Sequence, residues 1–199
     1  MKYLAFILLS TLLFGCSDST TENNGSDEKK QSPQEETQKE NNVGEEVIED
    51  STGSFKILES TEDVGTYQSG PLTISLSAAS LVSGTFTDDL FIDNIGREDV
   101  EYLNLGTEVS TTNENIVFTL DHLSLTTSTG EEIKSPNDFM SDGLNEKVLR
   151  EKEMPRFFVF MFDKSKAKEI DYVTLHVKSP VNDSGEKLGE DLDIEIPFK

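Results

Sequence analysis

The chain has 199 residues, a formal net charge of −22 at pH 7 and one cysteine. A protein this acidic is a poor partner for nucleic acid, because such binding depends on basic groups that displace counterions from the phosphates. A single cysteine also excludes a disulfide within the chain, so any exported part must fold without one.

The first residues have the pattern of an export signal. Lys2 supplies a positive start, and residues 4–14 are apolar apart from Ser10 and Thr11. This run is too short for a membrane-spanning helix, which needs about 20 residues. It has the length of the apolar region of a secretory signal peptide. We therefore expect a signal peptide over residues 1–15.

The cysteine follows this run directly. Leu13-Phe14-Gly15-Cys16 resembles the lipobox of bacterial lipoproteins, although Phe14 differs from the small residue usual at its position. The resemblance implies cleavage before Cys16 and a diacylglyceryl lipid on its thiol. Two acyl chains are enough to hold a protein stably on a membrane. The alternative is a plain secretory signal with an incidental cysteine, which leaves an unpaired thiol in an exported protein.

Residues 16–52 predict a disordered acidic linker. The segment has no aromatic residue, Val43, Val47 and Ile48 are its large apolar side chains, and acidic residues outnumber basic ones. Low hydrophobicity and charge repulsion both oppose folding. Such Ser/Thr/Asn/Glu-rich segments resemble the tethers of Gram-positive lipoproteins. The resemblance implies that the protein is anchored on the outer face of the cytoplasmic membrane and that its domain projects toward the cell wall.

Residues 53–199 predict one domain made of β-strands. Apolar residues alternate with polar ones over residues 72–76, 103–109, 173–177 and 192–198. Ile116, Phe118 and Leu120 share one parity, and the pattern then shifts to Leu123 and Leu125, which indicates a bend near Asp121 and His122.

Two further segments complete the expected elements. Residues 157–162 are apolar on both parities, as in a central strand covered on both faces, so we assign "RFFVFMF" to the core. Residues 143–153 place Leu144, Val148 and Leu149 on one face of a short helix. About seven or eight strands with turn signals between them predict an all-β, immunoglobulin-like antiparallel β-sandwich.

The body of the chain also resembles a known group. "VEYLNLGTEVSTTNENIVFTLDHLSLTTSTGEEI" has the order of elements found in telokin-like, immunoglobulin-fold domains of Gram-positive surface lipoproteins: a strand, a polar turn, a second strand and a Gly-Glu turn. Val109-Ser110-Thr111 differs from the asparagine usual after the second strand. The resemblance implies a fold and a location, and many members of the group have no known function.

Few residues point to catalysis. The two histidines, His122 and His176, lie in strand-like segments, and the side chain of Asp121 beside His122 faces the opposite side of a strand. We found no P-loop, no His-Glu-x-x-His pattern and no Gly-x-Ser-x-Gly pattern. We therefore expect no enzyme activity, no cofactor and no catalytic residues.

The acidic residues suggest one metal hypothesis. Calcium prefers oxygen ligands. Residues 88–99 could supply them from Asn94 and from four aspartates: Asp88, Asp89, Asp93 and Asp99. Their spacing differs from that of an EF-hand, and Asp/Asn-rich loops on a solvated face are common in acidic sandwiches, so we favour a solvated acidic loop.

Taken with the tether, these features predict a non-catalytic surface module. Its partners would be the membrane, through the lipid on Cys16, and a protein, peptide or cell-wall ligand bound by exposed loops. The alternatives are a calcium-stabilised adhesion-type domain and a hydrolase with Ser, Asp and Glu on its loops.

Overall fold

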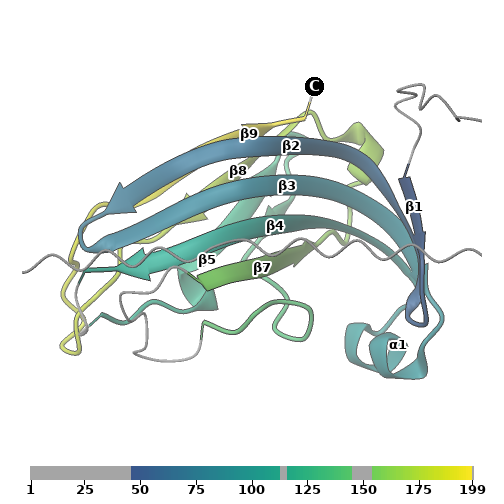
Figure 1. Ribbon diagram of the computed structural model, residues 1–199, viewed down its shortest axis with the longest axis horizontal. Coiled ribbons are helices and arrows are strands. Elements are labelled where there is room, and N and C mark those ends of the chain that lie inside the picture. The colour runs from purple at the N-terminus through teal and green to yellow at the C-terminus, as the bar shows by residue number, and fades with distance from the viewer. Residues whose placement is uncertain (1–45, 113–115, 145–153, 199) are drawn as a thin grey trace, which may run out of the picture. The chain divides into compact units, whose positions relative to one another are not determined.

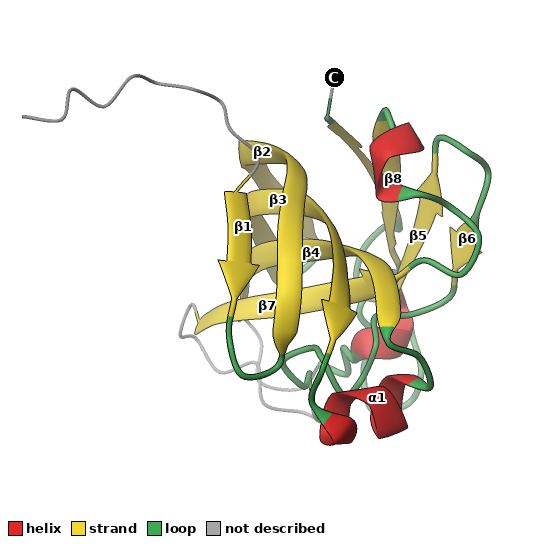
Figure 2. Ribbon diagram, turned by 90° about the vertical axis from the view of Figure 1, so that its right-hand side faces the viewer, coloured by secondary structure: helices red, strands yellow, loops and turns green. Residues whose placement is uncertain are grey.

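The computed structural model describes residues 46–112, 116–144 and 154–198, which form two antiparallel sheets. The first sheet has the order β1-β2-β3-β4-β7 and the second the order β6-β5-β8-β9 (Figures 1 and 2). Their strands are β1 (Glu46–Glu49), β2 (Gly53–Ser69), β3 (Leu72–Phe86), β4 (Asp99–Thr111), β5 (Leu123–Thr127), β6 (Glu132–Ile133), β7 (Met154–Met161), β8 (Tyr172–Val177) and β9 (Leu192–Pro197). Three short helices lie between them: α1 (Asp89–Ile95), η1 (Leu120–His122) and η2 (Ala167–Glu169). The predicted all-β sandwich is confirmed.

The long strands β2, β3 and β4 arch over the second sheet (Figure 1). They have 17, 15 and 13 residues, and the β2–β3 register shifts between Ile57 and Glu59 and again between Glu62 and Gly65. A bulge bends a strand and increases its twist. The shifts thus fit the curvature that brings the long strands around the core.

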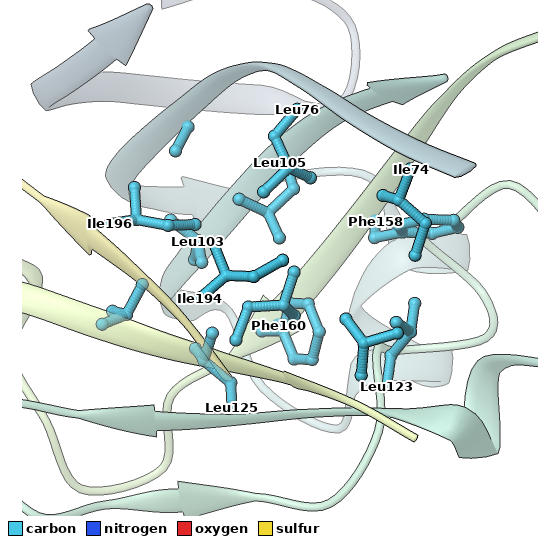
Figure 3. Packing of buried hydrophobic residues seen from close by; sticks show 14 of the residues in the cluster. Ile74, Leu76, Leu103, Leu105, Leu123, Leu125, Phe158, Phe160, Ile194 and Ile196 are labelled. Atoms are coloured by element: carbon cyan, nitrogen blue, oxygen red, sulfur yellow. The ribbon is translucent and has the colours of Figure 1, made fainter. Parts of the chain in front are cut away.

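The core lies between the two sheets (Figure 3). The alternating residues of the predicted strands supply it: Leu72, Ile74, Leu76, Leu103, Leu105, Leu123, Leu125, Val173, Leu175, Ile194 and Ile196 are all buried. Each buried branched side chain of this size stabilises the fold by about 1.5–3 kcal/mol relative to exposure. Alternation in the sequence therefore identified the inward faces correctly.

The predicted central position of residues 157–162 is wrong. β7 is the last strand of its sheet and pairs with β4 alone. Its free side is covered by residues 137–142: Asn137 N–H donates to the Val159 carbonyl at 2.7 Å, and Phe157 N–H donates to Asp142 Oδ2 at 2.8 Å. These contacts satisfy the edge, which explains how so apolar a strand avoids pairing with other chains.

The predicted bend near Asp121 and His122 is confirmed, but the strand before it is not regular. Residues 120–122 form the 3-10 helix η1, and Val117 makes an isolated bridge with Val181. His122 thus lies in a helical turn, whereas the sequence placed it in a strand. Its N–H donates to the Thr119 carbonyl at 3.0 Å, which closes the turn.

The paired residues begin before the predicted domain boundary. Residues 46–49, which the sequence placed in the linker, form β1 and pair with β2. The signal peptide, Cys16 and the linker up to residue 45 lie outside the described residues, as does the part of the predicted 143–153 helix from residue 145 onward.

The β2–β3 hairpin turns at Gly70, which has a φ of +57°. A Cβ at this position would clash with the Leu188 carbonyl, whereas a Cβ at Gly130, with a φ of +87°, would meet no atom within 4 Å.

We expect Gly130→Ala to cost about 1 kcal/mol of stability through its backbone conformation alone. Gly70→Ala should cost about 2 kcal/mol or more, because the clash adds to that term. Urea unfolding of both variants measures the difference, and equal costs would show that the Leu188 contact is unimportant.

Candidate functional site

A hollow of about 530 Å³ lies beside α1, and we call it the α1 groove. Its wall combines apolar side chains with amides and charges; its lining includes Ile95, Ile133, Phe139, Met161, Asn94, Arg97 and Asp138. Polar surface makes up the larger part of this lining, and the apolar side chains lie among the polar ones.

Helix α1 forms one wall and is capped at both ends. Asp88 Oδ1 accepts a hydrogen bond from Leu90 N–H at 2.8 Å, and Gly96, with a φ of +81°, donates its N–H to the Ile92 carbonyl at 2.7 Å. Asp, as an N-cap, and a left-handed Gly, as a C-cap, are favoured residues at these positions. The helix is therefore set by local sequence signals.

An aromatic row attaches α1 to the first sheet. Phe91 stacks on Phe86 of β3 with ring centroids 5.1 Å apart, and Phe139 meets Phe91 edge-on at 5.1 Å. Phe86 belongs to a second apolar cluster with Phe55, Val82 and Val100. Phe139 nevertheless keeps 40% of its surface exposed, so it is both held in place and available for contact.

The opposite wall is the segment 133–139, and Asn137 fixes it. Asn137 Oδ1 accepts hydrogen bonds from Phe139 N–H at 3.1 Å and Met140 N–H at 3.0 Å, while the Asn137 N–H is bound to β7. A side-chain amide that closes its own turn in this way is a typical Asx turn. The position of Phe139 therefore depends on the turn of residues 135–138, "SPND", which Asn137 closes.

Arg97 lines the α1 groove and is held there by two polar contacts. Its Nη1 lies 2.9 Å from Asp163 Oδ1, and Nη2 donates to the Phe162 carbonyl at 2.8 Å. On its other side is a second hollow of about 360 Å³, lined by Thr85, Glu101 and Lys166 among others. Arg97 and Asp163 line both hollows, so this ion pair forms the partition between them.

The loop that carries Asp163 is held by a buried carboxylate. Glu131 is 8% exposed and accepts backbone N–H groups from Asp163 at 2.8 Å, Lys164 at 3.0 Å and Ser165 at 2.6 Å. Burial works against ionisation of this carboxyl, but hydrogen bonds from the Ser165 side chain and the three amides outweigh it and lower the pKa of Glu131. Glu131 thus holds in place the loop that carries Asp163, the partner of Arg97 in the partition.

The calcium candidates are placed in different local roles. Asp88 caps α1, Asp89 and Asp93 lie on α1, and Asp99 at the start of β4 accepts a hydrogen bond from Thr85 Oγ1 at 2.8 Å. Within residues 46–112, 116–144 and 154–198, no group of three or more His, Cys, Asp or Glu side chains is arranged to hold a metal ion. Calcium binding stays a prediction. Its test is the melting temperature in millimolar calcium and in chelator, and an equal value in both would count against it.

The two histidines differ in their surroundings. His122 Nδ1 accepts a hydrogen bond from Thr119 N–H at 3.1 Å, and burial is the main cause of its lowered pKa. His176 lies in β8, as expected, and its side chain is 36% exposed. Neither histidine lines the α1 groove.

Comparison with known proteins supports the expectation from the first 16 residues. The chain is 24% identical over 152 residues to the SPbeta prophage-derived uncharacterized lipoprotein YonS of Bacillus subtilis strain 168, which covers 75% of this chain and 69% of YonS. The prediction of a Gram-positive lipoprotein of unknown function is confirmed. The telokin-like immunoglobulin type stays a prediction, and no family model matches the chain.

Among solved structures, the chain is similar to a putative lipoprotein, YcdA, also of Bacillus subtilis strain 168. The alignment has 16% identity and a TM-score of 0.44, and it covers 69% of this chain and 39% of that chain. In the part of our chain that the structure describes, no helix is both long enough and apolar enough to span a membrane.

The sequence pattern does not reveal the α1 groove. Its lining comes from three segments, around residues 94–97, 133–139 and 161–163. The one local signal was "SPND", whose turn presents Phe139. The contact between Phe91 and Phe139 connects residues far apart in the sequence, so residue spacing alone does not reveal it.

Proposed function

We propose that this lipoprotein acts as a binding module, held on the outer face of the cytoplasmic membrane by a lipid on Cys16. The acidic segment 16–45 would serve as the tether. A flexible coil of this length would reach about 30 Å or more, and charge repulsion would extend it. This arrangement places the folded domain where it meets ligands at the cell wall.

We further propose that the α1 groove binds a peptide segment of a partner protein. The observation that carries this proposal is the exposed, pre-positioned ring of Phe139 in a groove with both apolar and charged walls. Ile95, Ile133 and Met161 suit the aliphatic side chains of a peptide, and the polar part of the lining suits its backbone.

A pair of matched variants tests the proposal. Phe139 and Tyr172 are exposed aromatic residues with nearly equal exposure, 40% and 41%, and Tyr172 is in β8, outside the lining of the groove. We expect linear peptides selected from a display library against the full chain to bind with an affinity that Phe139→Ala weakens about tenfold or more. Tyr172→Ala should leave that affinity unchanged in calorimetry.

Three outcomes would contradict the proposal. The library yields no binding peptide, the selected peptides bind both variants equally, or soluble cell-wall glycan fragments bind in a Phe139-dependent manner while peptides do not. Melting curves of both variants establish that each remains folded.

A further inference from the structure

A line of three side chains crosses the outer face of the second sheet, and none of the three lines the α1 groove. His176 of β8 is paired in register with Ser124 of β5 and Asp193 of β9. His176 Nδ1 lies 2.6 Å from Asp193 Oδ1, and His176 Nε2 lies 2.8 Å from Thr126 Oγ1. Thr126 lies two residues beyond Ser124 and therefore on the same face of the sheet.

These contacts fix the roles of the atoms. An ionised carboxylate only accepts hydrogen bonds, so the proton between His176 and Asp193 is on Nδ1. In the neutral ring, Nε2 then carries the lone pair and accepts from the Thr126 hydroxyl. A hydroxyl next to a base that is oriented by a third group is the arrangement of an activated nucleophile.

The site has space and a favourable charge. Thr126 and His176 line a hollow of about 350 Å³ that also contains Lys134, Lys178 and Glu132. With Glu132 counted, these three side chains have a net charge of +1, and Lys178 Nζ donates to the Asp121 carbonyl at 3.3 Å, so Lys134 is the candidate to stabilise an intermediate that carries an oxyanion. His122, the other histidine, differs because its Nδ1 is occupied by a backbone amide.

We propose that Thr126 is a nucleophile for activated carboxylic esters, with His176 as its base and Asp193 as the residue that positions the imidazole. Thr126 Oγ1 attacks the ester carbonyl while its proton passes to His176 Nε2. The bond to the alcohol then breaks, and the alcohol leaves with that proton. Water attacks the acyl-threonine by the same route, which releases the acid and restores the hydroxyl.

The probe is p-nitrophenyl acetate, added to the mature lipidated chain in detergent. We expect nitrophenol release together with an acetyl group on Thr126, located by mass spectrometry of peptides. Thr126→Val should abolish this acetylation, and Thr126→Ser should retain it. His176→Gln should slow the acetylation of Thr126 by at least about 100-fold, the usual contribution of a positioned base, and Asp193→Asn should slow it in the same direction.

His122→Gln is the matched control, because it removes the histidine that is outside the line, and it should leave the rate unchanged. The proposal is overturned if the acetyl group appears on Lys134 or Lys178 and not on Thr126. It is also overturned if His176→Gln and His122→Gln have equal effects. Melting curves identify any variant that has lost its fold, and the Thr126→Val and Thr126→Ser pair then decides.

Discussion

Phe160→Ala is expected to lower the free energy of unfolding by about 3–5 kcal/mol, the usual cost of removing a buried phenylalanine ring. Phe160 is 0% exposed and lies in β7 opposite Leu103 of β4, with its ring in the core between the sheets. The cost has two parts: the lost transfer of the ring out of water and the cavity that the surrounding side chains cannot fill.

Phe157→Ala is the matched control on the same strand. Phe157 keeps 54% of its surface exposed and faces away from the core, so we expect a loss of less than about 1 kcal/mol. Urea unfolding of both variants gives the two values. Similar losses would contradict the orientation of β7, since a strand covered equally on both faces requires both rings to be buried.

The inward faces of the strands were predictable because alternation is a local property. Leu72, Ile74 and Leu76 all face the core, as two-residue periodicity requires. The same rule failed for β7, because apolar residues on both parities predicted cover on both faces, whereas Phe157 on the outer face is 54% exposed and β7 lies at the edge of its sheet. Here a loop, residues 137–142, occupies the place of a neighbouring strand.

The sequence pattern did not predict β2, and the reason is different. Its residues 58–64, "LESTEDV", include three carboxylates, and two register shifts interrupt any regular alternation. The strand exists because β3 pairs with most of its length and β1 pairs with residues 54–57. Such pairing depends on residues distant in the sequence, so tertiary context determines this element and local propensity does not.

The line of Thr126, His176 and Asp193 shows the same limit for a site. The sequence drew attention to the neighbours Asp121 and His122, whereas the structure joins His176 to an aspartate 17 residues away. That contact depends on the β8–β9 register, which the long connection from residue 178 to 191 leaves open. Once a register is known, cross-strand pairs of this kind follow directly.

Glu131→Gln is expected to lower the free energy of unfolding by about 2–4 kcal/mol at pH 7, because charge-assisted hydrogen bonds are worth about 1.5–3 kcal/mol each and a buried donor without a partner is costly. Both Glu131 oxygens accept backbone N–H groups. Gln keeps one of these oxygens and replaces the other with an NH₂ group, which cannot accept. At least one amide of the 163–165 loop then loses its partner.

The loss should depend on pH in a defined direction. The pKa of Glu131 in the folded chain lies below its ordinary value of 4.5. The unfolded chain therefore takes up the proton first on acidification, and the stability from this carboxylate is fully present above about pH 4.5 and lost as pH falls through the folded-state pKa. We expect the wild type and Glu131→Gln to differ most at neutral pH and to converge in acid.

Glu132→Gln provides the control, because it removes the same charge from the exposed neighbouring position and should cost less than about 0.5 kcal/mol. Urea unfolding from pH 7 to pH 3 measures all three proteins. A constant difference between the wild type and Glu131→Gln over that range would contradict a charge-dependent clamp. Because the clamped loop carries Asp163, the partner of Arg97, Glu131→Gln should also weaken peptide binding in the α1 groove, which links the stability of this loop to the proposed function.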